Sequence, residues 1–194
     1  MRHVRPIAGF AMVEVMVTVV IVAFGLLGIA GLISRSFVTE VEGTQRTQAL
    51  LLLQDMASRI EANRGNVASY RTEIAGLNTP ITGYTSGTVL CNPAAAATLA
   101  DRDRCEWGRM LAGANEQIGT RNAGVLVEAR GCVYEIDAFN RIYAVAIAWQ
   151  GMTAGPPPIT DTGFAPNGCG QGLYGNENRR RVMTLPVRLG TVGA

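Results

Sequence analysis

The stretch RPIAGFAMVEVMVTVVIVAFGLLGIAGLI, residues 5–33, decides the fold: a short basic leader, a Gly-Phe junction and a long apolar run. From Phe10 to Ile33 the only charged residue is Glu14. As an α-helix this run would be roughly 36 Å long, enough to cross the hydrocarbon core of a bilayer with some tilt. The apolar region of a cleaved secretory signal is only about 7–15 residues long. We therefore predict a membrane-spanning helix.

The charges on either side of the apolar run predict its orientation. Arg2 and Arg5 precede it, whereas the segment that follows it contains Arg35 and then Glu40 and Glu42. Because positively charged flanks stay on the cytoplasmic side of a membrane, we expect a cytoplasmic N-terminus. Everything after Ser34 should then lie outside the cytoplasm.

Glu14 is the unusual residue of the predicted span. A carboxylate costs on the order of 3 kcal/mol at the centre of a membrane and less near its edge, so some interaction should offset that cost. In one interpretation Glu14, four residues after Phe10, extends its side chain to the lipid headgroups. The other interpretation depends on the residues around it.

Gly9 and Phe10 form the junction, followed by Ala11-Met12-Val13 and by Glu14, the fifth residue after the glycine. This pattern resembles the class III signal of type IV prepilins, although those proteins more often have Thr-Leu-Ile before the acid. In that family a prepilin peptidase cuts after the glycine and N-methylates the new terminal residue, here Phe10. The resemblance implies that Glu14 neutralises the terminal amine of a neighbouring subunit in the lipid, where opposite charges attract more strongly than in water.

Gly25, Gly28 and Gly31 recur every three residues near the end of the span. Each costs roughly 1 kcal/mol relative to alanine in a helix, so this segment should be soft. The spacing differs from the small-xxx-small pattern of membrane helix dimers. Close helix packing is one interpretation. The resemblance supports another, in which the segment bends or partly melts in a fibre.

Composition limits the possible functions. The single histidine, His3, lies in the leader, which excludes Ser-His and Cys-His nucleophile pairs and histidine-containing metal sites for a processed chain. A net charge of +2 with 16% charged residues indicates no strong attraction for nucleic acid. No group of residues suggests an enzyme, and we expect no catalytic residue, no metal site and no cofactor.

Four cysteines lie on the predicted outer side of the membrane, at Cys91, Cys105, Cys132 and Cys169. An even number in an oxidising compartment predicts two disulfides, with three possible connectivities. We favour Cys91–Cys105 and Cys132–Cys169, because these pairs close two separate short loops. Each would stabilise the fold by about 3–4 kcal/mol. A zinc site is the alternative, but no pair has the two-to-four-residue spacing that zinc sites usually show.

The helix should continue beyond the membrane, because no proline interrupts it before Asn63-Arg64-Gly65. One helix from Phe10 to about Asn63 would be about 80 Å long. We expect residues 10–33 in lipid and residues 34–63 against a sheet. Apolar residues recur at helical spacing in the second half: Val38, Val41, Ala49, Leu52, Met56 and Ile60.

Residues 64–123 predict a loop region with a second helix. Asn92-Pro93 gives a cap and first-turn signal for a helix over Ala94–Gly113, with Trp107 and Leu111 packed inward.

The run Asp101-Arg102-Asp103-Arg104 in that helix predicts a solvated helix face. Asp101 and Asp103 could instead be a calcium pair. However, residues two apart point to different sides of a helix, which disfavours this alternative.

Residues 124–194 predict an antiparallel sheet. Extended patterns cover 124–136, Arg141–Gln150 and Arg179–Leu189. Arg141–Gln150 is apolar on both faces, which predicts a central strand covered on one side by the long helix. A Gly/Pro-rich loop, Gly151–Gly175, follows it, and Pro186 predicts that the last strand lies at an edge or is broken.

Arg179-Arg180-Arg181 allows two interpretations. Basic residues on an edge strand often prevent unwanted strand pairing, which is the interpretation we favour. The alternative is a docking patch for an anionic partner or DNA.

This order of elements resembles the type IV pilin fold, an α+β fold. A long N-terminal helix, transmembrane in its first half, packs on a small antiparallel sheet, with a helix in the αβ-loop and a disulfide-closed C-terminal loop. The expected parts are a leader (1–9), the two halves of the long helix (10–33 and 34–63), the αβ-loop (64–123) and the sheet region (124–194). Four further features resemble minor pilins: Gly25-Leu26-Leu27-Gly28, Asn63-Arg64-Gly65, an Ala-rich helix with Asp103 and Trp107, and Ala148-Trp149-Gln150-Gly151.

The resemblance implies a minor pilin, processed after Gly9, that primes pilus assembly and joins a tip complex for adhesion or twitching. It implies an inner-membrane precursor with a periplasmic C-terminal domain, and then a place in the extracellular pilus. The expected partners are the prepilin peptidase, other minor pilins, the major pilin, the inner-membrane assembly platform, a tip adhesin and membrane lipid. The alternatives are a minor pseudopilin of a type II secretion system and a DNA-uptake pilin that uses Arg179–Arg181.

Overall fold

A computed structural model of the chain describes most of its length and divides it into two compact units, Met1–Val41 and Glu42–Ala194. Gly9 and Phe10 lie outside the described residues. The described ranges are 12–74, 77–78, 81–82, 91–113, 117–119, 121–122, 124, 126–158 and 168–190.

The described part of the first unit is the N-terminal part of helix α1, which spans Met12–Ala62. Every residue from Met12 to Phe37 is exposed in the isolated chain. Among the described elements, α1 is the one helix that is long and apolar enough to cross a membrane, by length and composition. The hydroxyls of Thr18 and Ser34 donate to the backbone carbonyls of Val15 and Ala30, so these polar groups need no partner outside the helix.

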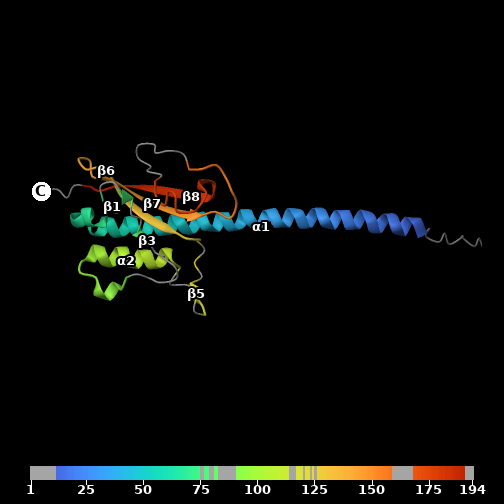
Figure 1. Cartoon of the computed structure of the whole chain (residues 1–194), viewed down its shortest axis with the longest axis horizontal. Coiled ribbons are helices and arrows are strands. Elements are labelled where there is room, and N and C mark those ends of the chain that lie inside the picture. Colours follow the sequence, from blue (N-terminus) through green and yellow to red (C-terminus); the bar gives the residue numbers. More distant parts are fainter. Residues whose placement is uncertain are drawn as a thin grey trace, which may run out of the picture. The chain divides into compact units, whose positions relative to one another are not determined.

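The second unit, which we call the head, is built on a four-stranded antiparallel sheet with the strand order β3-β6-β7-β8 (Figure 1). Two short hairpins, β1–β2 and β4–β5, accompany it. The strands are β1 (Glu73–Ile74), β2 (Leu77–Asn78), β3 (Ile81–Thr82), β4 (Gln117–Ile118), β5 (Arg121–Asn122), β6 (Arg130–Asp137), β7 (Ile142–Gln150) and β8 (Arg180–Arg188).

Short helical elements surround the sheet: η1 (Arg64–Tyr70), η2 (Pro93–Ala95), α2 (Leu99–Leu111) and η3 (Glu177–Arg179). Figure 1 shows α2 beside the C-terminal part of α1, and the indole N–H of Trp107 donates to the Leu52 carbonyl over 2.8 Å. The same ring lies against β6, because a Cβ added to Gly131 would overlap it. Trp107 therefore joins both helices to the sheet.

Strand β7 separates two cores, and its two faces are those that the sequence predicts. Tyr143, Val145, Ile147 and Trp149 face the main core, which also contains the buried residues of α1 and α2. The opposite face holds Ala144, Ala146 and Ala148, packed with Cys132, Cys169 and Tyr174. The small alanine side chains leave room there for a disulfide and a tyrosine ring from the C-terminal loop.

The predicted helix over Ala94–Gly113 is too long at both ends, because α2 begins at Leu99 and ends at Leu111. The Asn92 side chain does cap a helix, accepting a hydrogen bond from the Ala94 N–H, but this helix is only the single turn of η2. The backbone then becomes extended at Ala96 and Thr98. Thr98 begins a new helix, because its hydroxyl accepts from the Asp101 N–H and caps α2.

The strand predicted over 124–136 begins later than expected, at Arg130. The chain turns before it, and Glu128 has a φ of 52° that a strand does not allow. The last strand lies at an edge of the sheet, as Pro186 predicts, but it is continuous. Pro186 pairs with Ala144 within an unbroken register from Ile142↔Arg188 to Gln150↔Arg180.

Candidate assembly site

The candidate assembly segment is residues 12–37 of α1, in which Glu14 is the one acid and lies in the first turn of the described helix. A helix N-terminus favours a negative charge nearby. The side chains around Glu14 are apolar and exposed, so nothing inside the described chain pairs with it. The arrangement offers a carboxylate on an otherwise apolar helix to another molecule.

Gly25, Gly28 and Gly31 are helical, and a Cβ added at any of them would meet nothing within 4 Å. Packing inside the chain therefore does not require glycine at these positions. Both sequence interpretations, close packing with other helices and a soft segment, remain predictions.

The C-terminal half of α1 is held in the head by a polar network centred on Arg59. Its guanidinium contacts three carboxylates, those of Asp55 at 2.8 Å, Glu106 at 2.7 Å and Asp103 at 3.1 Å. Burial by itself would lower the pKa of Arg59, but the hydrogen bonds with Glu106 and Asp55 outweigh it and raise that pKa. The network fixes α2 against α1.

Asp103 extends this network to η1, because its second carboxylate oxygen accepts a hydrogen bond from the Tyr70 hydroxyl over 2.5 Å. Burial and this hydrogen bond raise the pKa of Tyr70 to about 12. The predicted solvated face is therefore wrong for Asp103, which is buried. Its spacing of four residues from Trp107 could have indicated an inward position.

A second polar contact lies where α1 enters the head. The Glu42 carboxylate accepts hydrogen bonds from the hydroxyl and the N–H of Thr153, in the loop after β7, and forms an ion pair with Arg181. The Thr153 hydroxyl, more than the arginine, lowers the pKa of Glu42. The Arg181 side chain fills the space beside Gly151 and Gly155, where a Cβ would meet it at 3.0 Å.

The arginine run does not form an exposed basic patch. Arg180 is 4% exposed, and its guanidinium donates to Glu177 and to the Cys169 carbonyl. Arg181 donates to the carbonyls of Asn178 and Thr153. Only Arg179 of the three is exposed, so the interpretation as a DNA-docking patch is wrong for Arg180 and Arg181. The interpretation as protection of the β8 edge stays a prediction.

The cysteines form the disulfides Cys91–Cys105 and Cys132–Cys169, the pairing that the sequence favours. The first connects the start of the η2 region to α2. The second connects β6 to the C-terminal loop across the alanine face of β7. In the described part of the chain, no group of three histidine, cysteine or acidic side chains could hold a metal ion.

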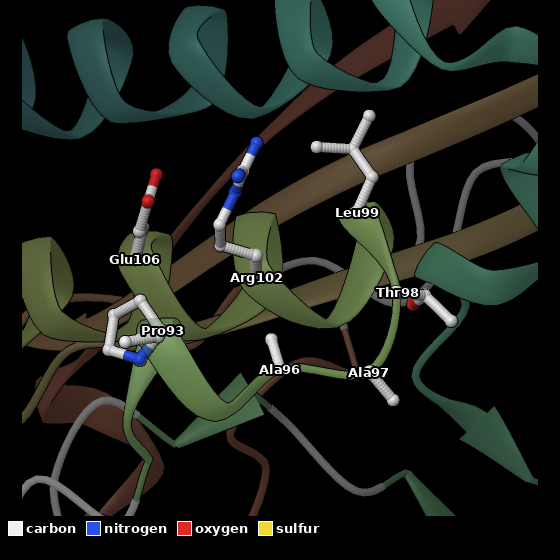
Figure 2. A pocket seen from close by; sticks show the side chains of 8 residues that line it. Pro93, Ala96, Ala97, Thr98, Leu99, Arg102 and Glu106 are labelled. Carbon is white, nitrogen blue, oxygen red and sulfur yellow. The ribbon is translucent and has the colours of Figure 1, made fainter.

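A hollow of about 530 Å³ lies between η2 and α2 (Figure 2). Leu99, Arg102 and Glu106 point from one face of α2 in Figure 2, as their spacing requires. The rest of its lining is small and, apart from the Thr98 hydroxyl that caps α2, apolar: Pro93, Ala94, Ala96, Ala97 and Thr98. Glu106 is already paired with Arg59, so no set of polar groups converges in this hollow for chemistry on a substrate.

Comparison with known proteins agrees with this architecture. The model of a family described as type IV pilin Tt1218 matches residues 31–105, from the end of the apolar segment to Cys105 in α2. No curated protein and no solved structure matches the chain. The matched family is structural rather than enzymatic, and a long apolar N-terminal helix fits membrane anchoring and a place in a pilus. The family match over residues 31–105, the α+β architecture and the exposed apolar helix agree, and together they support a member of the type IV pilin superfamily.

Proposed function

We propose that this chain is a minor pilin of the type IV pilus that primes pilus assembly and joins the tip complex, in adhesion or twitching. The features of the sequence that resemble minor pilins are most like those of PilV. The observation that carries the proposal is the exposed apolar surface of residues 12–33, in which Glu14 is the one charged residue. Water is a poor solvent for such a surface, so it needs lipid before assembly and other apolar helices after it.

Residues 10–33 would lie in the inner membrane while the head folds in the periplasm, with the N-terminus in the cytoplasm. The prepilin peptidase would cut after Gly9 and methylate Phe10. Glu14 would then attract the terminal amine of a neighbouring subunit, and this attraction is strong because lipid screens charge poorly. Pairing offsets part of the cost of keeping each charge in an apolar environment, so the paired groups are better tolerated between the packed helices of the fibre than either charge alone.

The head supplies recognition rather than chemistry in this proposal. Two disulfides and the Arg59 network hold α1, α2 and the sheet together. A rigid head presents fixed surfaces to other minor pilins, the major pilin, the assembly platform and a tip adhesin, which lowers the entropic cost of binding.

The test is the intact mass of the full chain produced with and without an active prepilin peptidase. We expect loss of residues 1–9 and one added methyl group at Phe10 only when the peptidase is present. An unprocessed chain in the presence of active peptidase would contradict the proposal.

The role of Glu14 is tested separately with Glu14→Gln, which removes the charge and keeps the shape. We expect normal processing but strong loss of the chain from purified pili. Glu40→Gln, on the same helix outside the apolar run, is the matched control and should assemble normally. Assembly of Glu14→Gln at the normal level would disprove the charge pairing.

Purified pili also separate this proposal from a type II secretion pseudopilin, which shares the same signal. A pilin should copurify with pili, and its deletion should reduce piliation. A deletion that blocks export of folded proteins and leaves piliation unchanged would favour the pseudopilin.

A further inference from the structure

The turn between β6 and β7 carries the most exposed large apolar side chain among the described residues. Phe139 is 93% exposed, in contrast to the buried residues on the strands that follow it. A single exposed apolar residue is common on protein surfaces and has no meaning by itself. Two further features distinguish this one: the backbone that presents it and the charged cleft beside it.

The backbone of this turn is fixed by contacts on both sides of Phe139. One oxygen of Asp137 accepts from the Asn140 N–H over 3.0 Å and the other from the Asn140 side chain over 2.6 Å, and these bonds lower the pKa of Asp137. Arg141, at φ 51°, donates to the Arg64 carbonyl over 2.7 Å and accepts from the Leu189 N–H. Binding through Phe139 would therefore order little backbone.

A cleft of about 480 Å³ adjoins the turn. Arg64 and Leu189, the two partners of Arg141, are among its lining residues, together with Glu61, Arg188 and Gly190. One residue, Asn140, separates Phe139 from Arg141, so their Cα atoms are at most about 7 Å apart. Arg141 therefore joins the turn that carries Phe139 to this cleft, at the end of β8 opposite Arg181.

The cleft contains arginine side chains that can pair with the carboxylates of another molecule. Arg64 and Arg188 are exposed, and neither forms an ion pair within the part of the chain that the structure describes. With Arg141, the turn and the cleft together carry three guanidinium groups and two carboxylates, those of Glu61 and Asp137, and both oxygens of Asp137 accept hydrogen bonds from Asn140. Arginine binds carboxylates through paired hydrogen bonds, and aromatic and arginine side chains dominate the energy of many protein interfaces.

We infer that this surface, made of Phe139, Arg64, Arg141 and Arg188, docks another protein that offers an apolar pocket with carboxylates at its rim. The ring would fill the pocket, and the arginines would pair with the rim. The identity of that protein as another pilin subunit rests on the proposed function. A nucleic acid suits the surface less well, because Glu61 and Asp137 repel phosphates.

The experiment places the photoreactive residue benzoylphenylalanine at position 139 of the full chain, in cells that assemble pili. Benzoylphenylalanine at position 173 is the matched control, because Leu173 is 48% exposed and lies on the C-terminal loop. After irradiation we expect one covalent product with a second pilin subunit from position 139 and none from position 173. Mass spectrometry of the product should place Asp or Glu next to the joined residue.

Charge reversal tests the electrostatic part of the inference. Arg188→Glu should lower the yield of the product at least about fivefold, because it places a carboxylate opposite the carboxylates of the partner. Arg179→Glu reverses an exposed arginine before the other end of β8 and should leave the yield unchanged. Both positions are exposed, so the unfolding midpoint should not move, and Arg64→Glu repeats the test if Arg188→Glu unfolds the head.

The inference is overturned by no product at position 139, by equal products at 139 and 173, or by products formed only with a second copy of this chain or with nucleic acid. An unchanged yield in both Arg188→Glu and Arg64→Glu would show that the arginines do not pair with carboxylates of the partner. If the chain is present in purified pili and no product forms, this inference fails and the proposed function stands. If the chain is absent from pili and the product forms with an acidic protein, the proposed function fails, but the inference that this surface docks another protein is retained.

Discussion

The two halves of α1 differ in what they do with their apolar side chains. Residues 12–33 are apolar on all sides apart from Glu14 and Thr18, and all are exposed in the isolated chain. In the second half one stripe is buried, including Ala49, Leu53, Met56 and Ile60, while the opposite side carries polar residues. A helix with one apolar stripe can satisfy itself inside a single domain, whereas one that is apolar all round needs a different solvent or other helices. One helix therefore serves two environments.

The strongest test of this contrast replaces one aromatic residue from each environment. Trp107 is fully buried against the second half of α1, and Trp107→Ala should lower the free energy of unfolding of the head by about 3–5 kcal/mol. Phe24 is exposed in the first half, and Phe24→Ala should change that free energy by less than about 0.5 kcal/mol.

The measurement is denaturant unfolding of the full chain in detergent, followed by tryptophan fluorescence. Both tryptophans lie in the head, and Trp149 remains as the reporter in Trp107→Ala. Equal destabilisation by the two substitutions would show that the first half of α1 contributes to the core of the head, and the contrast would be lost.

The disulfides should stabilise the head alone. Replacing Cys132 and Cys169 together by alanine opens a loop with a sequence separation of 37, and should cost about 4 kcal/mol on the chain-entropy model. The same change at Cys91 and Cys105, with a separation of 14, should cost about 3 kcal/mol. Unfolding of the two double variants measures both losses, and a larger loss at Cys91 and Cys105 would contradict the model.

Asp103 tests whether the second half of α1 depends on buried polar contacts as well as apolar ones. Asp103→Asn weakens the bonds to Arg59 and Tyr70 and should cost about 1–3 kcal/mol. Asp101→Asn is the matched control, because Asp101 belongs to the same charge run but is exposed, and it should cost less. If both variants lost the same free energy of unfolding in denaturant, the buried hydrogen bonds of Asp103 would contribute no more to stability than the hydrogen bonds of Asp101.

The Tyr70 hydroxyl adds a dependence on pH to the same network. Its pKa is raised from 10.0 to about 12 in the folded chain, so the stabilising contribution is complete below pH 10 and is lost as the pH rises toward 12. Tyr174 and Tyr143 also have raised pKa values. Tyr70→Phe should therefore reduce, without abolishing, the fall in stability across this range. An unchanged fall in unfolding measurements between pH 10 and 12 would contradict the assignment.

The smallest expected effect is at Glu42, close to where α1 changes from one environment to the other. Its pKa is lowered below 4.5 in the folded chain, so its contribution is present above pH 4.5 and is lost as the pH falls through the folded value. Glu42→Gln should cost less than about 1 kcal/mol at pH 7. The variant should also lose less stability on acidification to pH 3 than the unchanged chain, as measured by its unfolding midpoint.

The features that the sequence predicts correctly depend on pattern or composition. The long helix follows from a run with no proline, and the two faces of β7 follow from strict alternation between Ile142 and Trp149. The edge position of β8 follows from Pro186, which has no N–H to share with a second neighbour.

The features that the sequence misses depend on contacts between distant residues or on single backbone angles. Asp103 is buried because Arg59, 44 residues earlier, and Tyr70, 33 residues earlier, supply its hydrogen bonds. Arg180 and Arg181 are held by loop carbonyls that no local pattern shows. Residues 94–97 have good helix propensity, but the Thr98 cap starts a separate helix.

The bridge between Cys132 and Cys169 also sets an order of events. Exchange of a disulfide requires a thiolate to reach one of its sulfurs, and these two residues are 1% and 0% exposed. The bond must therefore close before the alanine face of β7 is fully packed, and it can reopen only when that packing is lost. A head that stays folded therefore keeps this covalent connectivity, and the packed state protects the bond that stabilises it.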